Sequence, residues 1–521
     1  MEPEQPVHGR QSSGRQVKRG LLVTSSVAGA AVMVVEILGS RVLGPFYGVG
    51  LFVWSALLAV TLASLALGYF LGGVLADRSS SRHLISVLLI VAGVLIGLVP
   101  AFARTVLRAG DTLGLRAGAL ASALLLLGPA LLALGAVTTA VVRRASVGSA
   151  RPGRDVGIVY AVSTLGGLLG TLLTGFVLVP AWEVHTILRV TAAIVVLTGL
   201  IGLVRHGGSR LAALALLAPM TPVARTPPAP FVRVLERSES LHGQLSVVED
   251  RSHGPLVRLL RADHSFVGGH WVGTGEPAFG FLHLLEAVKL ARPEGRRLLQ
   301  IGLGIGSLPM ALAKQGVRSD VVEIDPEVVR LARTHFAYDA PGDVFAEDAR
   351  TLIRRLDRRY DFIVHDAFTG GAVPEHLLSL EVLQRLKALL VPGGVLCLNI
   401  VGAAAGPLSA STRAVNATVR AVFPHVRAFR DGPDRGPGAI SNIVFFAAAQ
   451  VVRFKKPDMY ESANCEAVLS SFERWEVFEE DDPSAHVITD AENPLSRLAL
   501  PVSEAFRREM RALYPLEFWL D

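Results

Sequence analysis

The sequence predicts a multi-span α-helical membrane region followed by an α/β Rossmann-like domain, with a small N-terminal β-sheet between them. Two observations lead to this prediction. Nearly all the long apolar runs of the 521-residue chain lie before residue 221. In the second half an apolar strand runs into a glycine-rich turn, LLQIGLGIGS at 298–307, and strand and helix patterns then alternate to about residue 450. Such alternation is typical of a parallel sheet covered by helices.

The composition limits the classes of function. Hydrophobic residues make up 51% of the chain, which is a high share for a soluble protein. The 51 basic and 45 acidic residues leave a net charge of only +6, much of it in short loops beside apolar segments. Charge in these places predicts orientation in a membrane rather than nucleic-acid binding. Cys397 and Cys465 have no metal-binding spacing, so we expect no metal site and no disulfide framework.

Six segments are long and apolar enough to cross a bilayer, for which roughly 20 residues are needed. They lie at about 20–44, 51–76, 84–103, 117–142, 157–181 and 186–204. A further stretch at 211–224 is short and contains two prolines, so an interfacial or re-entrant position is favoured over a seventh span. We therefore expect a membrane region over 20–224. The basic N-terminus, 1–19, is expected to be disordered and not a cleaved signal.

The basic residues beside the spans predict the orientation. With the N-terminus in the cytoplasm, the inner segments carry twelve Lys and Arg residues and the outer segments at most five. An excess of basic residues is typical of cytoplasmic loops. Six spans would also return the C-terminal domain to the cytoplasm. The expected location is the cell membrane, multi-pass, with both the N-terminus and the C-terminal domain cytoplasmic, and the lipid bilayer is an expected partner.

One carboxylate lies deep in the first span. A buried Glu36 is costly, so it either serves a cationic substrate or protons, or it pairs with Arg41 or Arg189 and fixes helix packing. The packing interpretation is favoured. The fifth span carries small residues, which allow close helix packing. These are Gly166, Gly167, Gly170 and Gly175.

The soluble half begins after a proline-rich linker at 225–231 and divides into three parts. Apolar residues alternate over 232–280, which predicts a small antiparallel β-sheet. Residues 281–450 carry the alternating strands and helices of a Rossmann-like nucleotide-binding domain. Residues 451–521 form a C-terminal extension.

The glycine turn is the main candidate for nucleotide binding. Gly302, Gly304 and Gly306 would let the backbone turn tightly and approach a ligand. The next strand ends about 20 residues later in Glu323 and Asp325, where an acidic side chain can accept hydrogen bonds from ribose hydroxyls. No Lys-Ser or Lys-Thr pair follows the glycines, which argues against a triphosphate site.

Two more acidic residues follow the next two strands. Asp348 is placed to accept a hydrogen bond from an adenine amino group. Asp366 ends the strand YDFIVHD, at the sheet edge where ligands of open α/β sheets bind. The other interpretation of Asp366 is a helix cap or a loop carboxylate, and His365 beside it is interpreted as a loop residue rather than a base. Asp348 and the PGG turn at 392–394 favour an adenosyl-sulfur ligand over a nicotinamide nucleotide.

Residues 232–450 resemble the spermidine synthase (polyamine aminopropyltransferase) family, and the order of the regions resembles its membrane-fused bacterial members. The resemblance implies a class I methyltransferase-like fold. It implies that the three glycines, Glu323 and the pair Asp348–Ala349 bind the nucleoside, and that Asp366 takes a proton from the attacking amine. The co-substrate would be decarboxylated S-adenosylmethionine, without a metal, and methylthioadenosine would leave.

The chain departs from the family at several groups that recognise the amine. Ile305 stands where the glycine loop usually carries an Asp, and Thr369 where the catalytic loop usually carries a second one. Asp263 matches an Asp of the family's hairpin, and Gln244 lies next to the place of a family Gln. The losses predict weaker polyamine binding, because a buried cation needs paired carboxylates. Ile305 also removes a charge that would repel the carboxylate of S-adenosylmethionine.

The C-terminal extension contains a polar cluster, VITDAENPLSRL at 487–498. A capped turn before the last helix is the favoured interpretation. The alternative is a lid over the site, where Asp490, or Glu276 from elsewhere, could replace the missing carboxylates.

Three functions remain open. The favoured one is a membrane-bound, spermidine synthase-like aminopropyltransferase that acts on a polyamine such as putrescine. The second is an S-adenosylmethionine-dependent methyltransferase. The third is a non-catalytic membrane protein that senses or transports polyamines or nucleosides. A small amine is the expected partner, nucleic acid is not, and homo-oligomerisation is left open.

Overall fold

A computed structural model describes the chain except residues 1–7, 48–50, 80, 207–230, 253, 264, 369–372, 433–435, 458–459, 479–484, 515–517 and 519–521. The chain divides into two compact units, a first that ends at Thr226 and a second that begins at Pro227. The candidate span at 211–224 and nearly all of the linker at 225–231 lie outside the described residues.

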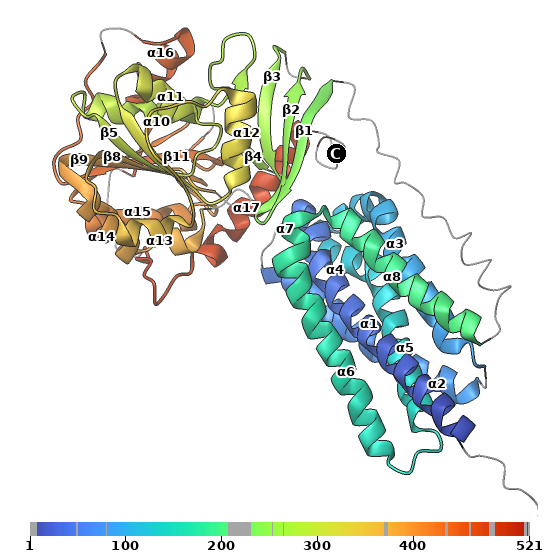
Figure 1. Ribbon diagram of the computed structural model, residues 1–521. Helices are drawn as coiled ribbons and strands as arrows, with labels where there is room; N and C mark the ends of the chain where they lie inside the picture. The colour runs from blue at the N-terminus through green and yellow to red at the C-terminus, as the bar shows by residue number, and fades with distance from the viewer. Residues whose placement is uncertain are drawn as a thin grey trace, which may run out of the picture. The chain divides into compact units, whose positions relative to one another are not determined.

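The first unit is a bundle of helices (Figure 1). Its elements are α1 (His8–Tyr47), α2 (Leu51–Arg78), α3 (Leu84–Asp111), α4 (Gly114–Leu126), α5 (Gly128–Ser146), α6 (Pro152–Leu173), the π-helix η1 (Thr174–Leu178), α7 (Val179–Ala181) and α8 (Val184–Arg205). In the described part of the chain, five helices are long and apolar enough to cross a membrane, and a bent pair would make a sixth. The first helix begins at His8, within the stretch expected to be disordered.

The bent pair occupies the fourth expected span, 117–142. Its two helices, α4 and α5, meet at Leu127 with a bend of 49°. Pro129 lies in the first turn of α5. Because proline has no N–H and its ring clashes with the preceding turn, the helix is interrupted rather than continuous at this point.

Glycines bring the helices of the bundle into close contact. A Cβ atom on Gly29 would lie 2.1 Å from the Ser163 carbonyl oxygen, and one on Gly166 would lie 2.2 Å from that of Ser26. Helices α1 and α6 therefore approach at backbone distance, as small residues permit. Gly167 and Gly170 also face α1, whereas Gly175 meets no neighbour within 4 Å.

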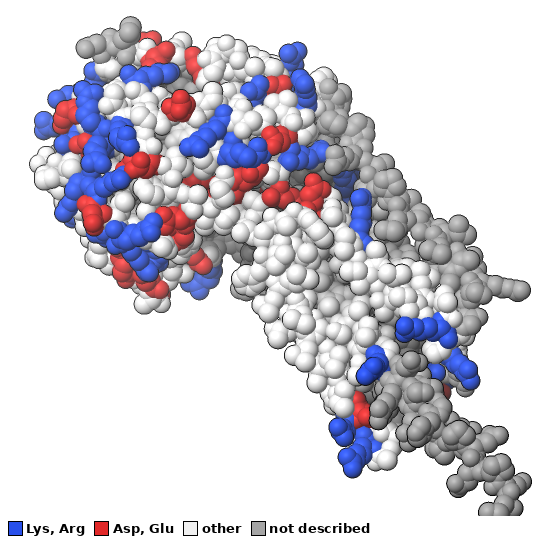
Figure 2. All heavy atoms as spheres, viewed as in Figure 1, with Lys and Arg blue, Asp and Glu red and all other residues white. Residues whose placement is uncertain are grey.

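Charged side chains are absent from much of the visible surface of the bundle. On the face shown in Figure 2, a wide band of the helical unit carries no charged side chain, and charged residues gather near one end. The ion pair of Arg143 with Asp77 joins the C-terminal ends of α5 and α2. Glu36 is partly buried within α1.

The second unit begins with the expected small antiparallel sheet. Its strands are β1 (Val232–Ser240), β2 (Gly243–Asp250), β3 (Val257–Ala262) and β4 (Ser265–Trp271), paired in chain order. One face of this sheet packs on α12 (Pro326–Phe336) through apolar residues of β2 and β3. The other face packs on the C-terminal helix α17 (Leu495–Leu513) and Phe518.

A mixed eight-stranded sheet forms the core of the second unit. Its strands are β5 (Arg297–Ile301), β6 (Arg318–Glu323), β7 (Val344–Ala346), β8 (Tyr360–His365), β9 (Leu390–Gly402), β10 (His425–Arg430), β11 (Ser441–Ala448) and β12 (Glu476–Val477). They lie in the order β12-β10-β11-β9-β8-β5-β6-β7. The strands from β7 to β9 are parallel, and β11, β10 and β12 add antiparallel pairs. The carboxyl ends of β5, β6, β7 and β8 therefore share one edge.

Helices cover both faces of the large sheet (Figure 1). One face carries α10 (Gly280–Ala291), α11 (Ser307–Lys314) and α16 (Ala463–Leu469). The other carries α13 (Ala349–Arg355), α14 (Leu380–Leu389) and α15 (Ala410–Val422). Two short 3₁₀ helices, η2 (Glu375–Leu377) and η3 (Phe472–Trp475), complete the unit. This is the Rossmann-like architecture that the sequence predicts.

Candidate active site

The glycine turn joins β5 to α11 in a conformation that suits glycine. Gly302, Gly304 and Gly306 all have positive φ, at 87°, 61° and 81°. A Cβ atom on Gly302 would lie 2.4 Å from the carbonyl oxygen of Asp366, and one on Gly306 would lie 2.4 Å from the Tyr338 ring. A side chain at either position would meet both backbone strain and a steric clash. The turn therefore passes directly beside the end of β8.

Glu323 ties the end of β6 to this turn. Its Oε2 accepts a 2.9 Å hydrogen bond from the backbone N–H of Leu303, and its Oε1 accepts one of 3.0 Å from that of Asp325. Burial raises the pKa of Glu323, and these backbone hydrogen bonds oppose the rise. Each carboxylate oxygen keeps a second lone pair, so both oxygens can still accept from a ribose hydroxyl.

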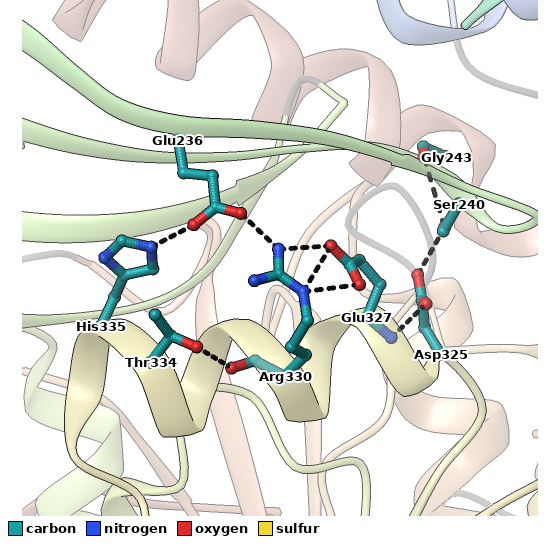
Figure 3. Close-up of polar contacts among 8 residues, drawn as sticks. All are labelled: Glu236, Ser240, Gly243, Asp325, Glu327, Arg330, Thr334 and His335. Atoms are coloured by element: carbon teal, nitrogen blue, oxygen red, sulfur yellow. Dashed lines mark hydrogen bonds and ion pairs between the residues drawn. The ribbon is translucent and has the colours of Figure 1, made fainter. Parts of the chain in front are cut away.

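Asp325 is engaged by the protein on both oxygens. Its Oδ1 accepts from the N–H of Glu327 at 2.9 Å and caps α12, and its Oδ2 accepts from the Ser240 hydroxyl at 2.6 Å. Figure 3 shows the Ser240 hydroxyl between Asp325 and the carbonyl oxygen of Gly243. This residue, expected to contact ribose, thus holds the β1–β2 hairpin against the strand end.

A second set of contacts fixes the small sheet on α12 (Figure 3). Glu236 of β1 accepts from the Arg330 guanidinium and lies 2.5 Å from His335 Nε2. Glu327 also binds Arg330, at 2.9 and 3.0 Å from its Nε. Hydrogen bonds from His335 and Arg330 lower the pKa of Glu236. The middle of β1 is therefore anchored on α12.

Asp348 and Ala349 lie at the start of α13. Asp348 Oδ1 accepts from the backbone N–H of Thr351 at 2.8 Å and so caps the helix. Its Oδ2 lies 3.2 Å from His376 Nε2, which belongs to η2. Although burial opposes it, these hydrogen bonds lower the pKa of Asp348. The oxygen expected to accept from adenine is therefore shared with an exposed histidine.

Asp366 lies at the carboxyl end of β8, next to the glycine turn. Its backbone N–H donates to the carbonyl oxygen of Ile301 at 2.9 Å, which places it beside Gly302. Its Oδ1 accepts a 2.8 Å hydrogen bond from the side-chain amide of Asn399 on β9. Burial raises the pKa of Asp366 to about 6, and the hydrogen bond from Asn399 limits the rise. A carboxylate with this pKa suits a base that works near neutral pH.

The candidate substrate residues are placed in part. Gln244, near the start of β2, and Asp263, just after the end of β3, are hydrogen-bonded to each other. Asp263 Oδ1 accepts from the backbone N–H of Gln244 at 3.0 Å, and the backbone N–H of Asp263 donates to the Gln244 carbonyl at 2.8 Å. Asp263 has a positive φ of 50°. Its carboxylate lies against Gly243, and hence next to the Ser240–Asp325 contact. Thr369 lies outside the described residues.

Ile305 is a core residue. It is 3% exposed and packs with apolar residues of β2, β3 and α12. A Cβ atom on Gly268 of β4 would lie 3.0 Å from its side chain. The side chain that replaces the family's Asp therefore holds the glycine turn against the small sheet.

His365 belongs to β8 rather than to a loop. It is fully buried, its Nε2 lies 3.2 Å from the Leu377 carbonyl oxygen, and burial lowers its pKa to about 4. A neutral, enclosed imidazole is not suited to act as a base at this edge.

The C-terminal segment returns to the loop that follows Asp366. Asp490 accepts from the Ser379 hydroxyl at 2.6 Å and from the Arg350 guanidinium. The side-chain amide of Asn493 donates to the Glu375 carbonyl at 2.8 Å. The segment thus holds the chain between Glu375 and Ser379 in place. Both carboxylate oxygens of Asp490 are engaged by protein groups. Glu276 accepts from Asn464 at 2.7 Å.

Sequence reasoning did not identify three residues that shape this site. Asn399 and Gln300 are polar side chains within otherwise apolar strands, and both are buried. Gln300 Nε2 donates to the Gly302 carbonyl at 2.7 Å. A buried amide in an apolar strand is costly unless it is hydrogen-bonded, so its presence in LCLNIV and LLQIG was the available signal. His376 gave no such signal.

The geometry supports a defined kind of chemistry. Glu323 and the Asp366 carboxyl group, whose pKa is raised, lie directly beside the glycine turn, and Asp348 follows β7 at the same edge of the sheet. No Lys or Arg is bound to Asp366 in the described part of the chain. Residues 283–428, which include these groups, match the family model described as the spermine/spermidine synthase domain.

Residues 283–428 of the second unit form a spermine/spermidine synthase domain. In this synthase domain the matched residues extend from α10 to β10 and include the glycine turn, Glu323, Asp348 and Asp366. The family prediction from the sequence is thereby confirmed.

Individual relatives include two kinds of transferase. The chain is 34% identical over 237 residues to an N-terminal histidine N-methyltransferase of Emericella nidulans, and this alignment covers 41% of this chain and 41% of that protein. It is 41% identical over 128 residues to a polyamine aminopropyltransferase of Vibrio vulnificus, and that alignment covers 23% of this chain and 43% of the relative. The chain therefore spans less than half of the length of either relative.

Among solved structures, the chain is similar to a probable spermidine synthase from Corynebacterium glutamicum. The similarity has a TM-score of 0.40 and 19% sequence identity, and it covers 50% of this chain and 97% of that one.

Proposed function

We propose that the protein is a transferase that moves an aminopropyl group from decarboxylated S-adenosylmethionine to an amine. The observation that carries the proposal is the Asp366 carboxyl group beside the glycine turn. Burial raises its pKa to about 6, and Asn399 holds it in place. The match of residues 283–428 to the spermine/spermidine synthase domain and the similarity of the chain to a polyamine aminopropyltransferase support the same reaction class.

In the proposed step the amine nitrogen attacks the aminopropyl carbon bound to the sulfonium. A nitrogen–carbon bond forms, the carbon–sulfur bond breaks, and its electron pair leaves with the sulfur of neutral methylthioadenosine. The attacking nitrogen must lose a proton, and Asp366 accepts it. Above pH 6 this carboxylate is mostly ionised and ready to do so.

The nucleoside would be held by groups that already surround the turn. Glu323 would accept from the ribose hydroxyls through its remaining lone pairs, because its other contacts are backbone N–H groups. Asp348 Oδ2 would accept from the adenine amino group after the exposed His376 moves away. Asp325 would act through the small sheet, which it anchors, rather than through the ligand.

One observation favours a second candidate, transfer of a methyl group from S-adenosylmethionine. Ile305 removes the carboxylate with which the family's glycine loop usually meets the donor's amine, and the residue lies in an apolar cluster. The similarity to an N-terminal histidine N-methyltransferase points the same way. Asp366 would then accept a proton from a nitrogen that receives a methyl group.

The leaving nucleoside distinguishes the two reactions. We would incubate the purified full chain in detergent with each donor and a set of amines, and identify the product by mass spectrometry. Methylthioadenosine supports aminopropyl transfer, and S-adenosylhomocysteine supports methyl transfer. Tight donor binding without either product would contradict both and leave the sensing or transport function.

Asp366→Asn serves as the matched variant. It keeps the size of the side chain and removes the base, so turnover should fall by about 100-fold or more while donor affinity changes little. Turnover equal to that of the wild type would contradict the role given to Asp366.

We further propose that the first unit anchors the enzyme in the cell membrane with the second unit in the cytoplasm. The support is the length and apolar character of its helices and the excess of basic residues in the segments assigned to the inside. Adenosyl donors are made in the cytoplasm, which suits this orientation.

A further inference from the structure

A second cluster of chemically active side chains lies away from the glycine turn. His283 and Glu286 occupy one face of α10, three residues apart, and Cys465 comes from α16. All three are buried, at 4%, 5% and 3% exposure. The helices α10 and α16 pack against each other on the same face of the large sheet (Figure 1). The cluster thus joins the synthase domain to its C-terminal extension.

The distances in the cluster match those between the ligands of a tetrahedral metal ion. His283 Nδ1 lies 3.1 Å from Glu286 Oε1, Cys465 Sγ lies 3.8 Å from Glu286 Oε2, and one ligand atom of each residue lies within 4.8 Å of the others. Zinc bonds of about 2.0 Å to N and O and 2.3 Å to S place tetrahedral ligands about 3.3 to 3.6 Å apart. Only small side-chain movements would be needed.

The charges of the cluster also suit a divalent cation. No Lys or Arg pairs with Glu286 among the described residues: Lys289 of the same helix donates to the Gly295 carbonyl at 2.8 Å, and Lys314 binds Glu461 at 3.0 Å. A buried carboxylate without a full counter-charge is costly. One carboxylate, one thiolate and a neutral imidazole around an M²⁺ ion have no net charge, which removes this cost.

One buried nitrogen of the cluster has no protein partner. His283 Nε2 is enclosed and makes no hydrogen bond in the described part of the chain. Buried imidazole nitrogens normally find a partner. Nδ1 is the nitrogen that faces Glu286, so metal binding there would leave the proton of the ring on Nε2, and the enclosed N–H would need an acceptor such as a buried water molecule.

We propose that His283, Glu286 and Cys465 form a structural zinc site that fastens α16 to α10. Nitrogen, oxygen and thiolate sulfur in tetrahedral arrangement are the donor set that zinc prefers over magnesium or calcium. The fourth position belongs to a water molecule, while Glu461, which acts electrostatically on both Glu286 and Cys465, keeps its ion pair with Lys314. The site is separate from the proposed transfer reaction and takes no part in it.

The metal itself provides the first test. The full chain, purified in detergent without chelators, should contain about one zinc per chain by elemental analysis. After removal of the zinc, Co²⁺ should restore a thiolate-to-cobalt charge-transfer band together with the visible bands of tetrahedral Co²⁺. Absence of saturable Zn²⁺ binding and of the cobalt–thiolate band would overturn the proposal and leave a buried His–Glu pair.

The two cysteines of the chain provide a matched pair of variants. Cys465→Ser should abolish the cobalt–thiolate band and weaken zinc binding by more than about 100-fold, because losing a direct ligand costs more than losing a group that only orients one. Cys397→Ser, in the core strand β9, should keep both. Equal zinc affinity and an unchanged band in Cys465→Ser would overturn the proposal.

Thermal unfolding gives an independent readout if Cys465→Ser folds poorly. Added Zn²⁺ should raise the melting temperature of the metal-free wild-type chain and of Cys397→Ser, because a ligand that binds only the folded state stabilises it. His283→Gln should lose this response. A zinc-dependent shift in His283→Gln equal to that of the wild type would exclude His283 as a ligand and overturn the three-residue site.

Discussion

The side-chain amide of Asn399 on β9 donates a 2.8 Å hydrogen bond to Oδ1 of Asp366 at the end of β8. Asn399 is fully buried and Asp366 is partly buried, so this contact is largely shielded from solvent. Burial pushes the pKa of Asp366 up and the Asn399 donor pulls it down, and the balance is about 6. In the proposed reaction Asn399 would therefore position Asp366 and also set the pH at which Asp366 can act as a base.

Replacing this donor should move the pH profile. In Asn399→Leu the ionised form of Asp366 loses a hydrogen bond, so its pKa rises above 6. A hydrogen bond to a charged group contributes about 1.5–3 kcal/mol, so the acidic limb of kcat/KM should move up by about one unit or more. The measurement is the profile of the proposed transfer reaction between pH 5 and 9. An unmoved limb would show that the two residues are not coupled.

Asp366→Asn should stabilise the ligand-free protein while it removes the base. The pKa of Asp366 is raised from 3.8 to about 6 in the folded state. Below about pH 3 the carboxyl is protonated in both states and burial of the charge costs nothing, whereas above pH 6 the folded state carries the full cost of the charge. The variant should therefore gain up to about 3 kcal/mol in free energy of unfolding at neutral pH and almost nothing at about pH 3. Denaturant unfolding at both pH values tests this, and an equal effect at both would contradict it.

Gly302→Ala should damage the site and the fold together. The new Cβ atom would lie 2.4 Å from the Asp366 carbonyl oxygen at a φ of 87°. We expect a loss of roughly 1–3 kcal/mol and of donor binding. Gly273→Ala is the control, because nothing lies within 4 Å of its Cβ position. Thermal unfolding and donor titration give the result, and equal behaviour of the two variants would refute the assignment.

Ile305→Asp should fail to restore amine recognition. Its side chain would be buried among Leu245, Leu260, Val328 and neighbouring apolar residues. An ionised carboxylate there has no partner, so we expect a loss of roughly 3 kcal/mol or more, against about 1 kcal/mol for Ile305→Val. Stability of both variants is read from denaturant unfolding. A stable Ile305→Asp protein with improved amine turnover would show that this position faces the substrate after all.

A reporter fused to the C-terminus should report the cytoplasm. The prediction follows from six crossings and from the basic residues that flank them. A second fusion in the segment between α3 and α4 should report the opposite side. An external signal from the C-terminal fusion would mean that residues 211–224 form a further span.

The sequence predicts the positions of Glu323, Asp325 and Asp366 but not all of their contacts. Glu323 and Asp366 were identified because the carboxyl ends of parallel strands lie at one edge of a sheet, and chain order alone predicts this. Asp325 was assigned to ribose by the same reasoning, but both of its oxygens bind protein groups. The pattern locates a strand end; it does not say which neighbours occupy its side chain.

Asp366 therefore owes its place to the sequence and its chemistry to the fold. Apolar runs, the glycine turn and acidic strand ends are local patterns, and they determined the two regions and the edge at which the ligand would bind. The Asn399 donor, the apolar surroundings of Ile305 and the cluster of Glu286 with Cys465, 179 residues apart in the chain, were decided by tertiary packing. Contacts between elements distant in sequence depend on which helix and strand faces meet, and local periodicity does not contain that information.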